Sequence, residues 1–174
     1  MIKVFIVASE LGNINRGYEA SLKECFDNLR HSPNFDFFLF KGNGEQLERE
    51  FVIPNLSSST SLAFKLGSFT RKGKDGARFV HELSYFPRLL VYLEKYKPHI
   101  IYLSGDKLAK LLFYWKNLRS LNYKIIFRNG GPMTPPYFYT DLVQHITPVH
   151  CQEAIEFGEN PDKHLVLPTG FKIS

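Results

Sequence analysis

The chain has 174 residues, of which 44% are hydrophobic and 15% aromatic, which is ample for a packed core and excludes a disordered protein. No apolar run approaches the roughly 20 residues of a membrane span, and the apolar start lacks a signal-peptide cleavage pattern. The net charge of +5 is concentrated in one segment, which contains Lys65, Arg71, Lys72, Lys74 and Arg78 but only one acidic residue.

The first thirty residues predict a strand, a polar loop and a helix. Residues 3–8 form a nearly continuous run of β-branched and aromatic residues, which is typical of a parallel strand buried on both faces. The loop over residues 9–17 contains two glycines. The helix that follows has an apolar face at helical spacing, formed by Leu22, Cys25, Phe26 and Leu29. This arrangement is the first half of a βαβ unit.

The rest of the chain repeats this alternation. Further strands are predicted over residues 35–40, 50–54, 98–103, 123–128, 142–147 and 164–168. Helices are predicted over residues 77–96, 108–118 and 150–157, and Pro87 should kink the first of these or mark a new start. Residues 61–77 have no clean period and are predicted to be irregular. The pattern therefore predicts an α/β fold: an open, mostly parallel Rossmann-like sheet of about six to seven strands with helices on both faces.

The cysteines and histidines indicate neither a disulfide nor a metal site. Cys25 and Cys151 are far apart, and Cys25 is expected to be a small core residue in a reducing cytosol. The six histidines have no ligand spacing, and His99 and His145 are expected in strands, in the core or at a sheet edge. No metal is predicted.

Small, polar or glycine-rich loops follow four of the predicted strands, over residues 12–17, 104–106, 129–131 and 148–150. These loops must meet at the carboxyl edge of a parallel sheet, where open α/β sheets bind ligands. Each loop alone could simply close a tight turn. The usual phosphate-loop, dinucleotide and serine-hydrolase motifs are absent. The substrate-binding candidates are Gly12, Asn13, Arg16, Gly17, Ser104, Asp106, Asn129 and Gly130.

Three stretches resemble a known family. They are Arg16-Gly17-Tyr18-Glu19, Lys97-Pro98-His99-Ile100-Ile101-Tyr102, and the ending from Gly158 to Phe171, with its Pro161-Asp162-Lys163 and Pro168-Thr169-Gly170. In this order and spacing, the whole chain resembles the N-terminal half of retaining, two-Rossmann-domain (GT-B) glycosyltransferases of family four.

The resemblance implies that residues 1–174 form the N-terminal, acceptor-side domain of a glycosyltransferase whose C-terminal, donor-binding domain is not in this chain. The parent enzyme would transfer a sugar from a nucleotide-diphosphate sugar to a sugar, lipid or glycan acceptor, and this domain would hold no cofactor. Gly12 would approach the donor phosphates, and Arg16 would lie in the acceptor region or brace the loop. Asn129 stands where many members have a histidine near the reacting carbon, so it is a weak catalytic candidate or only shapes the pocket.

The basic segment leaves three interpretations open. It could be a solvated surface loop, or a membrane or lipid-acceptor contact through Lys65, Arg71, Lys72, Lys74 and Arg78. A nucleic-acid interface ranks lowest because no recognition motif accompanies the charge. For the whole chain, the alternatives are a stand-alone Rossmann or flavodoxin-like module that binds a phosphorylated small molecule, or an anionic-lipid interaction domain. The expected location is the cytoplasm, with peripheral contact at the inner membrane face as an option.

Overall fold

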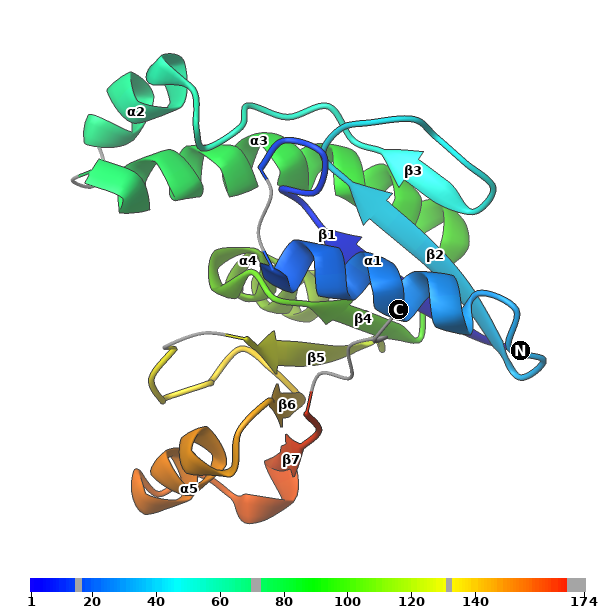
Figure 1. The fold of residues 1–174 in the computed structure, drawn as a ribbon, viewed down its shortest axis with the longest axis vertical. Helices are drawn as coiled ribbons and strands as arrows, with labels where there is room; N and C mark the ends of the chain where they lie inside the picture. Colours follow the sequence, from blue (N-terminus) through cyan, green and yellow to red (C-terminus); the bar gives the residue numbers. More distant parts are fainter. Residues whose placement is uncertain (15–16, 70–72, 131–132, 169–174) are drawn as a thin grey trace.

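The computed structural model describes residues 1–14, 17–69, 73–130 and 133–168 (Figure 1). They form one seven-stranded sheet in the order β3-β2-β1-β4-β5-β6-β7, and every neighbouring pair is parallel. The strands are β1 (Ile2–Ala8), β2 (Phe35–Lys41), β3 (Glu50–Val52), β4 (Ile100–Leu103), β5 (Lys124–Asn129), β6 (Leu142–His145) and β7 (His164–Val166). The predicted fold class is confirmed, and the seven predicted strands are all present, although β3, β4, β6 and β7 are shorter than predicted.

Helices cover both faces of the sheet (Figure 1). They are α1 (Gly17–Leu29), α2 (Ser61–Ser68), α3 (Gly73–Tyr96), α4 (Asp106–Leu118) and α5 (Pro148–Glu156), with a short 3-10 turn, η1 (Pro161–Lys163). Since successive strand residues point to opposite faces, β1 serves two cores. One core packs Val4 and Ile6 against α1, and the other packs Phe5 and Val7 against α3 and α4.

The prediction of irregular structure over residues 61–77 is wrong, because α2 and the start of α3 occupy this segment. The Thr60 side chain caps α2 by accepting a hydrogen bond from the Ala63 amide. The backbone of Gly67 in α2 lies directly against that of Gly76 in α3, at a distance that leaves no room for a Cβ. The buried contact residues of α2 are small, and its large apolar residues, such as Leu62 and Leu66, are exposed, so the buried face of this helix could not be recognised from the sequence.

Pro87 does not end a helix, contrary to one of the two expectations for it. It lies on the exposed side of α3, which continues from Gly73 to Tyr96. The opposite side of the helix buries Tyr85, Leu89 and Leu93 in the core. That burial outweighs the loss of one helical hydrogen bond at the proline.

The histidine and cysteine expectations hold only in part. His145 is fully buried in β6. His99 instead lies exposed just before β4, where its ring accepts a hydrogen bond from the Lys3 amide. Cys25 is half-buried beside the α1 core, and Cys25 and Cys151 are both free thiols. Within the described ranges, no helix is both long and apolar enough to cross a membrane.

Candidate functional site

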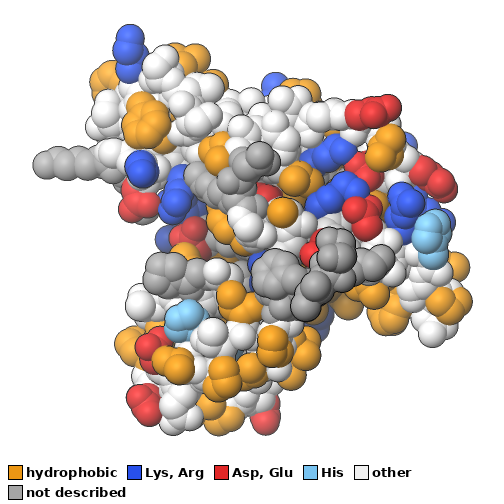
Figure 2. Space-filling view, in the orientation of Figure 1, with side chains coloured by type: hydrophobic (Ala, Val, Ile, Leu, Met, Phe, Trp, Pro, Cys, Tyr) orange, Lys and Arg blue, Asp and Glu red, His pale blue; other side chains and the backbone are white. Residues whose placement is uncertain are grey.

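A pocket of about 170 Å³ opens at the carboxyl edge of the sheet. The loop after β1, the start of α1, the first half of α3, the start of α4 and the end of β5 enclose it. Its charged or titratable lining residues are Glu10, Tyr18, Glu19, Arg78, His81, Glu82, Asp106, Lys107 and Arg128. We call it the polar pocket. Figure 2 shows acidic and basic side chains gathered where the molecule is hollowed at this edge, between the α2–α3 part and the β6–α5 part. Such a lining suits a ligand with many hydroxyl groups.

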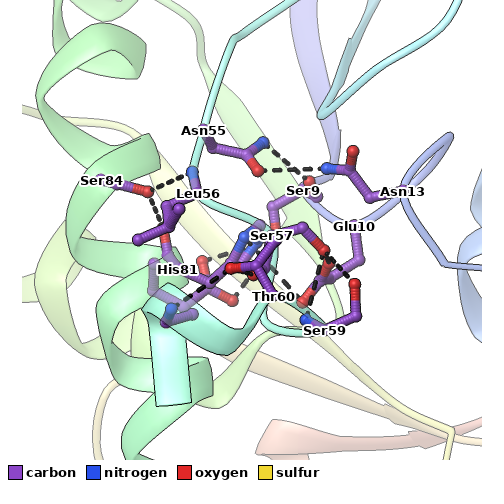
Figure 3. A network of polar contacts seen from close by, with 12 residues as sticks. Ser9, Glu10, Asn13, Asn55, Leu56, Ser57, Ser59, Thr60, His81 and Ser84 are labelled. Atoms are coloured by element: carbon purple, nitrogen blue, oxygen red, sulfur yellow. Dashed lines mark hydrogen bonds and ion pairs between the residues drawn. The ribbon is translucent and has the colours of Figure 1, made fainter. Parts of the chain in front are cut away.

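Ser9 and His81 form the centre of a buried polar network beside this pocket (Figure 3). The Ser9 hydroxyl lies 3.0 Å from His81 Nε2, and the two groups share a hydrogen bond. On the other side of the ring, His81 Nδ1 is 3.9 Å from Glu10 Oε1. Ser9, Glu10 and His81 are all at least nine-tenths buried. The arrangement can hold and pass a proton between a bound hydroxyl group and the imidazole.

Glu82 adds a carboxyl group to this network. Its two oxygens lie 3.4 and 3.5 Å from the Ser9 hydroxyl. Burial, together with the negative charges of Glu19, Glu10 and Asp106, raises the pKa of Glu82 to about 8. The Glu82 carboxyl group is therefore mostly protonated at pH 7 and can donate as well as accept a hydrogen bond.

The absence of a side chain at Gly105 leaves space for the Glu82 carboxyl group. A Cβ at Gly105 would lie 2.9 Å from Glu82 Oε1, closer than real Cβ contacts allow. Gly105 is also the residue before α4, and it supplies no side-chain cap to that helix. The Glu82 carboxyl group thus lies against the backbone at the start of α4, next to Asp106 and Lys107.

The segment over residues 55–60 fixes the loop after β1 (Figure 3). The Asn55 side-chain amide donates to the Ser9 carbonyl at 3.3 Å, and its oxygen accepts from the Asn13 side chain at 3.1 Å. The Ser57 hydroxyl donates to Glu10 Oε2 at 3.5 Å. This serine-rich stretch holds the pocket wall in place.

The structure brings together some of the predicted site residues. Ser104, Asp106, Gly130 and Arg78 line the polar pocket. Gly12, Asn13 and Gly17 are not among its lining residues. Arg16, Arg71 and Lys72 lie outside the described residues.

Gly12 has a different structural role from the one expected. It has a φ of +84°, and the position of its missing Cβ is filled by the backbone of Asn43 in the loop after β2. A neighbouring loop, not a ligand, thus makes the close approach at Gly12. A contact between this loop and a substrate stays a prediction.

Asn129 is fully buried at the end of β5. Its side-chain amide donates to the Tyr137 hydroxyl at 2.8 Å and to the Met133 carbonyl at 3.2 Å. The amide nitrogen also lies 3.5 Å from His145 Nδ1. Asn129 therefore shapes the segment that follows β5. Its catalytic role stays a prediction.

His145 continues this cluster to the edge of the sheet. Its Nε2 lies 2.9 Å from His164 Nδ1, and His164 Nε2 is 3.4 Å from Glu159 Oε2. Burial lowers the pKa of His145 to about 4, with a further contribution from His164. The pair is therefore neutral at pH 7 and ties β6 to β7. In the described parts of the chain, no group of three His, Cys, Asp or Glu side chains could hold a metal ion.

Sequence reasoning missed the centre of the site. Ser9 and Glu10 directly follow a predicted buried strand, which is a signal that could have singled them out. His81 and Glu82 lie inside a long helix, and only the fold brings them to the first loop. Arg128 was counted as a strand residue, yet its guanidinium reaches the Ser21 hydroxyl of α1 at 3.0 Å and lines the pocket.

The fold and the pocket define the class of the molecule: a Rossmann-like α/β domain with a polar pocket at the carboxyl edge of its sheet. No protein-family model and no curated protein sequence matches the chain. Among solved structures, it is similar to the apo form of the lipopolysaccharide outer core galactosyltransferase WaaB, with a TM-score of 0.58 and 11% sequence identity. The match covers 95% of this chain but only 45% of that one, so the chain spans less than half the length of this enzyme. The likeness establishes a fold shared with part of a glycosyltransferase.

Proposed function

We propose that the chain is the N-terminal, acceptor-side domain of a two-domain glycosyltransferase, and that the polar pocket receives the acceptor sugar. The observation that supports this most directly is the pocket itself, at the carboxyl edge of a domain whose fold is shared with WaaB. Carboxyl groups, imidazole and hydroxyl groups alternate there with Arg78, Lys107 and Arg128. A sugar offers hydroxyl groups that both donate and accept, so each of these side chains has a partner on it.

The finer parts of the proposal come from the sequence resemblance. They are a nucleotide-diphosphate sugar as the donor, transfer with retention, and a separate C-terminal domain that binds the donor. In this scheme the present domain supplies no cofactor site, and it acts on the cytoplasmic side of a membrane. Ser9 and Glu82 would orient the acceptor hydroxyl, and the His81 imidazole would take up its proton as the new bond forms.

NMR titration of the 15N-labelled chain tests the proposal. Methyl glycosides of glucose and galactose should shift the amide signals of Ser9, Gly105, Lys107 and Gly130. Uridine and guanosine diphosphates should bind weakly because the donor site lies in the other domain. Arg78→Gln should weaken sugar binding, whereas Lys74→Gln, a neutralised lysine exposed on the same helix, should not.

Tight nucleotide binding would contradict the acceptor-side assignment. A dissociation constant in the micromolar range, about −8 kcal/mol, would place a nucleotide site in this domain. It would favour the alternative of a stand-alone module for a phosphorylated small molecule.

A peripheral membrane contact is a second candidate, supported by the surface of α2 and the residue after it. Leu62, Leu66 and Phe69 are 53%, 44% and 88% exposed, and Lys65 lies among them. Apolar side chains interleaved with basic ones suit an anionic lipid surface. Lys74 and Arg78 of α3 extend the basic charge toward the polar pocket. This contact would bring the pocket close to a lipid-linked acceptor.

A further inference from the structure

A second pocket, of about 350 Å³, opens beside the polar pocket, between α4 and the segment over residues 133–140. We call it the aromatic pocket. The two pockets share three lining residues, Asp106, Lys107 and Met133. Lys107 Nζ is 3.2 Å from Asp75 Oδ1, so the Lys107 side chain is held at the boundary between the pockets. The two pockets are therefore adjacent compartments of one larger site.

The two compartments differ in chemistry. The aromatic pocket is lined by the rings of Phe127, Pro136, Tyr137 and Tyr139. Of these, Tyr139 is half-exposed, and its ring is fixed from two sides. The Phe113 and Tyr114 rings lie 5.6 and 5.7 Å from it, between centroids, and Lys110 Nζ lies 5.0 Å from its centroid. Tyr139 thus offers a ring whose position is set before any ligand binds.

This combination fits a sugar ring. The C–H face of a pyranose is apolar and packs on an aromatic ring, while its rim carries hydroxyl groups. The aromatic pocket is also lined by polar side chains, among them those of Asp75, Lys110, Thr134 and Thr140. A lipid chain would cover these polar side chains without offering them any hydrogen bond, and their desolvation would cost free energy. A sugar would satisfy them.

We propose that the aromatic pocket binds the second sugar unit of the acceptor, while the terminal unit occupies the polar pocket. The acceptor is then an oligosaccharide of at least two units, and Tyr139 determines this preference. This inference rests on the proposed function, and it narrows the acceptor from a sugar, lipid or glycan to a chain of sugars. Lys107, at the boundary, would contact the glycosidic linkage region.

The test compares matched sugars by NMR titration of the chain. The probes are methyl glucoside and methyl galactoside against maltose, lactose and melibiose, which are disaccharides of the same units. At least one disaccharide should bind about fivefold tighter or more than its terminal monosaccharide. It should also shift the amide signals of Lys110, Thr134 and Thr140. Tyr139→Ala should reduce its affinity to that of the monosaccharide and leave monosaccharide binding unchanged.

Two further variants distinguish the loss of a second sugar subsite from a folding defect. Phe138→Ala removes a neighbouring aromatic ring that is 66% exposed and does not line the pocket, so it should have no effect. Lys110→Gln, on an exposed side chain, should weaken disaccharide binding without disturbing the fold. If both sugar classes bind equally and neither Tyr139→Ala nor Lys110→Gln matters, the second subsite is refuted while the proposed function stands. If no probe shifts the polar pocket, both the proposed function and the inference fail.

Discussion

Glu82 is a buried carboxyl group with other carboxylates close to it. Its pKa lies at about 8 instead of 4.5 because burial and neighbouring carboxylates oppose its charge. Between these two pH values, the folded chain keeps a proton that the unfolded chain releases. The contribution of Glu82 to the free energy of unfolding must therefore fall as the pH rises from about 4.5 to about 8.

Glu82→Gln should remove this pH dependence, because glutamine keeps the shape and never ionises. Urea unfolding should give nearly the same stability for the variant and the wild type at pH 5. At pH 8.5 the variant should be more stable, by on the order of a few kcal/mol. Glu45→Gln, at an exposed position, is the matched control and should change nothing at either pH. An identical pH profile for Glu82→Gln and the wild type would show that Glu82 ionises normally in the folded chain.

Gly12 gives a second prediction at this scale. Gly12→Ala should lower the free energy of unfolding by about 2 kcal/mol or more, because its φ is positive and the Asn43 backbone occupies the space of the new Cβ. Gly44→Ala is the control, since Gly44 also has a positive φ but has open space around it. Chemical denaturation should show a distinctly larger loss for Gly12→Ala. Equal losses would mean that backbone conformation alone requires a glycine at position 12.

Individual residues also show how much of the candidate site could be predicted from the sequence. Glycines after strands could be located, and Ser104, Asp106 and Gly130 do line the polar pocket. What each glycine touches could not be predicted, because the Asn43 backbone meets Gly12 only after β2 has paired with β1. His81 and Ser9 are 72 positions apart, and no spacing rule connects them.

At the scale of elements, the helical spacing of apolar residues predicted a helix correctly wherever that helix buries large side chains. Helices α1 and α4 show this, with stripes that include Leu22 and Phe26 in one and Leu108 and Leu112 in the other. The same logic failed for α2, whose buried residues are only Ala63 and Gly67. The large apolar side chains of α2, among them Leu62 and Leu66, are exposed and do not mark its buried face. The contact between α2 and α3 depends instead on the close approach of the two backbones, because dispersion attraction falls off steeply with distance.

That dependence predicts the effect of Gly67→Ala. The new Cβ would overlap the Gly76 backbone, so α2 should separate from α3 while the sheet stays folded. Hydrogen exchange should become faster for the amides of α2 and remain unchanged for those of β1 and β4. Gly17→Ala, where nothing lies within 4 Å of the new Cβ, should leave the exchange of α2 unaltered. Unchanged protection of α2 in Gly67→Ala would mean that the two helices can shift apart without losing their contact.

At the scale of the whole molecule, the regular alternation of strands and helices was enough to predict the sheet. Parallel strands need crossover connections, and right-handed crossovers leave few ways to arrange them. The site is harder to predict because it forms where segments distant in sequence converge: the first loop, residues 55–60, α3, the start of α4 and the end of β5. The aromatic pocket depends on the segment over residues 133–140, and its proline- and tyrosine-rich sequence does not indicate which elements it would contact.

The last prediction concerns the whole molecule: we expect it to bind a membrane surface through the projecting α2–α3 part. Leu62, Leu66 and Phe69 are exposed beside Lys65, so the chain should bind vesicles that contain anionic lipid and bind neutral ones much less. Added salt should weaken binding, since exposed charges are screened over about 8 Å at physiological ionic strength. Flotation or sedimentation with vesicles of stated composition measures both effects.

Two sets of substitutions distinguish the contributions to this binding. Lys65→Gln with Lys74→Gln should remove most of the salt-sensitive part, and Phe69→Ser should weaken the part that remains at high salt. Leu118→Ser is the matched control, because Leu118 is 76% exposed but ends α4, away from α2. Equal binding to neutral vesicles, or no binding to anionic ones, would leave α2 as an ordinary solvated surface. In that case the acceptor would have to reach the polar pocket from solution, and the oligosaccharide preference expected from Tyr139 would still be testable without a membrane.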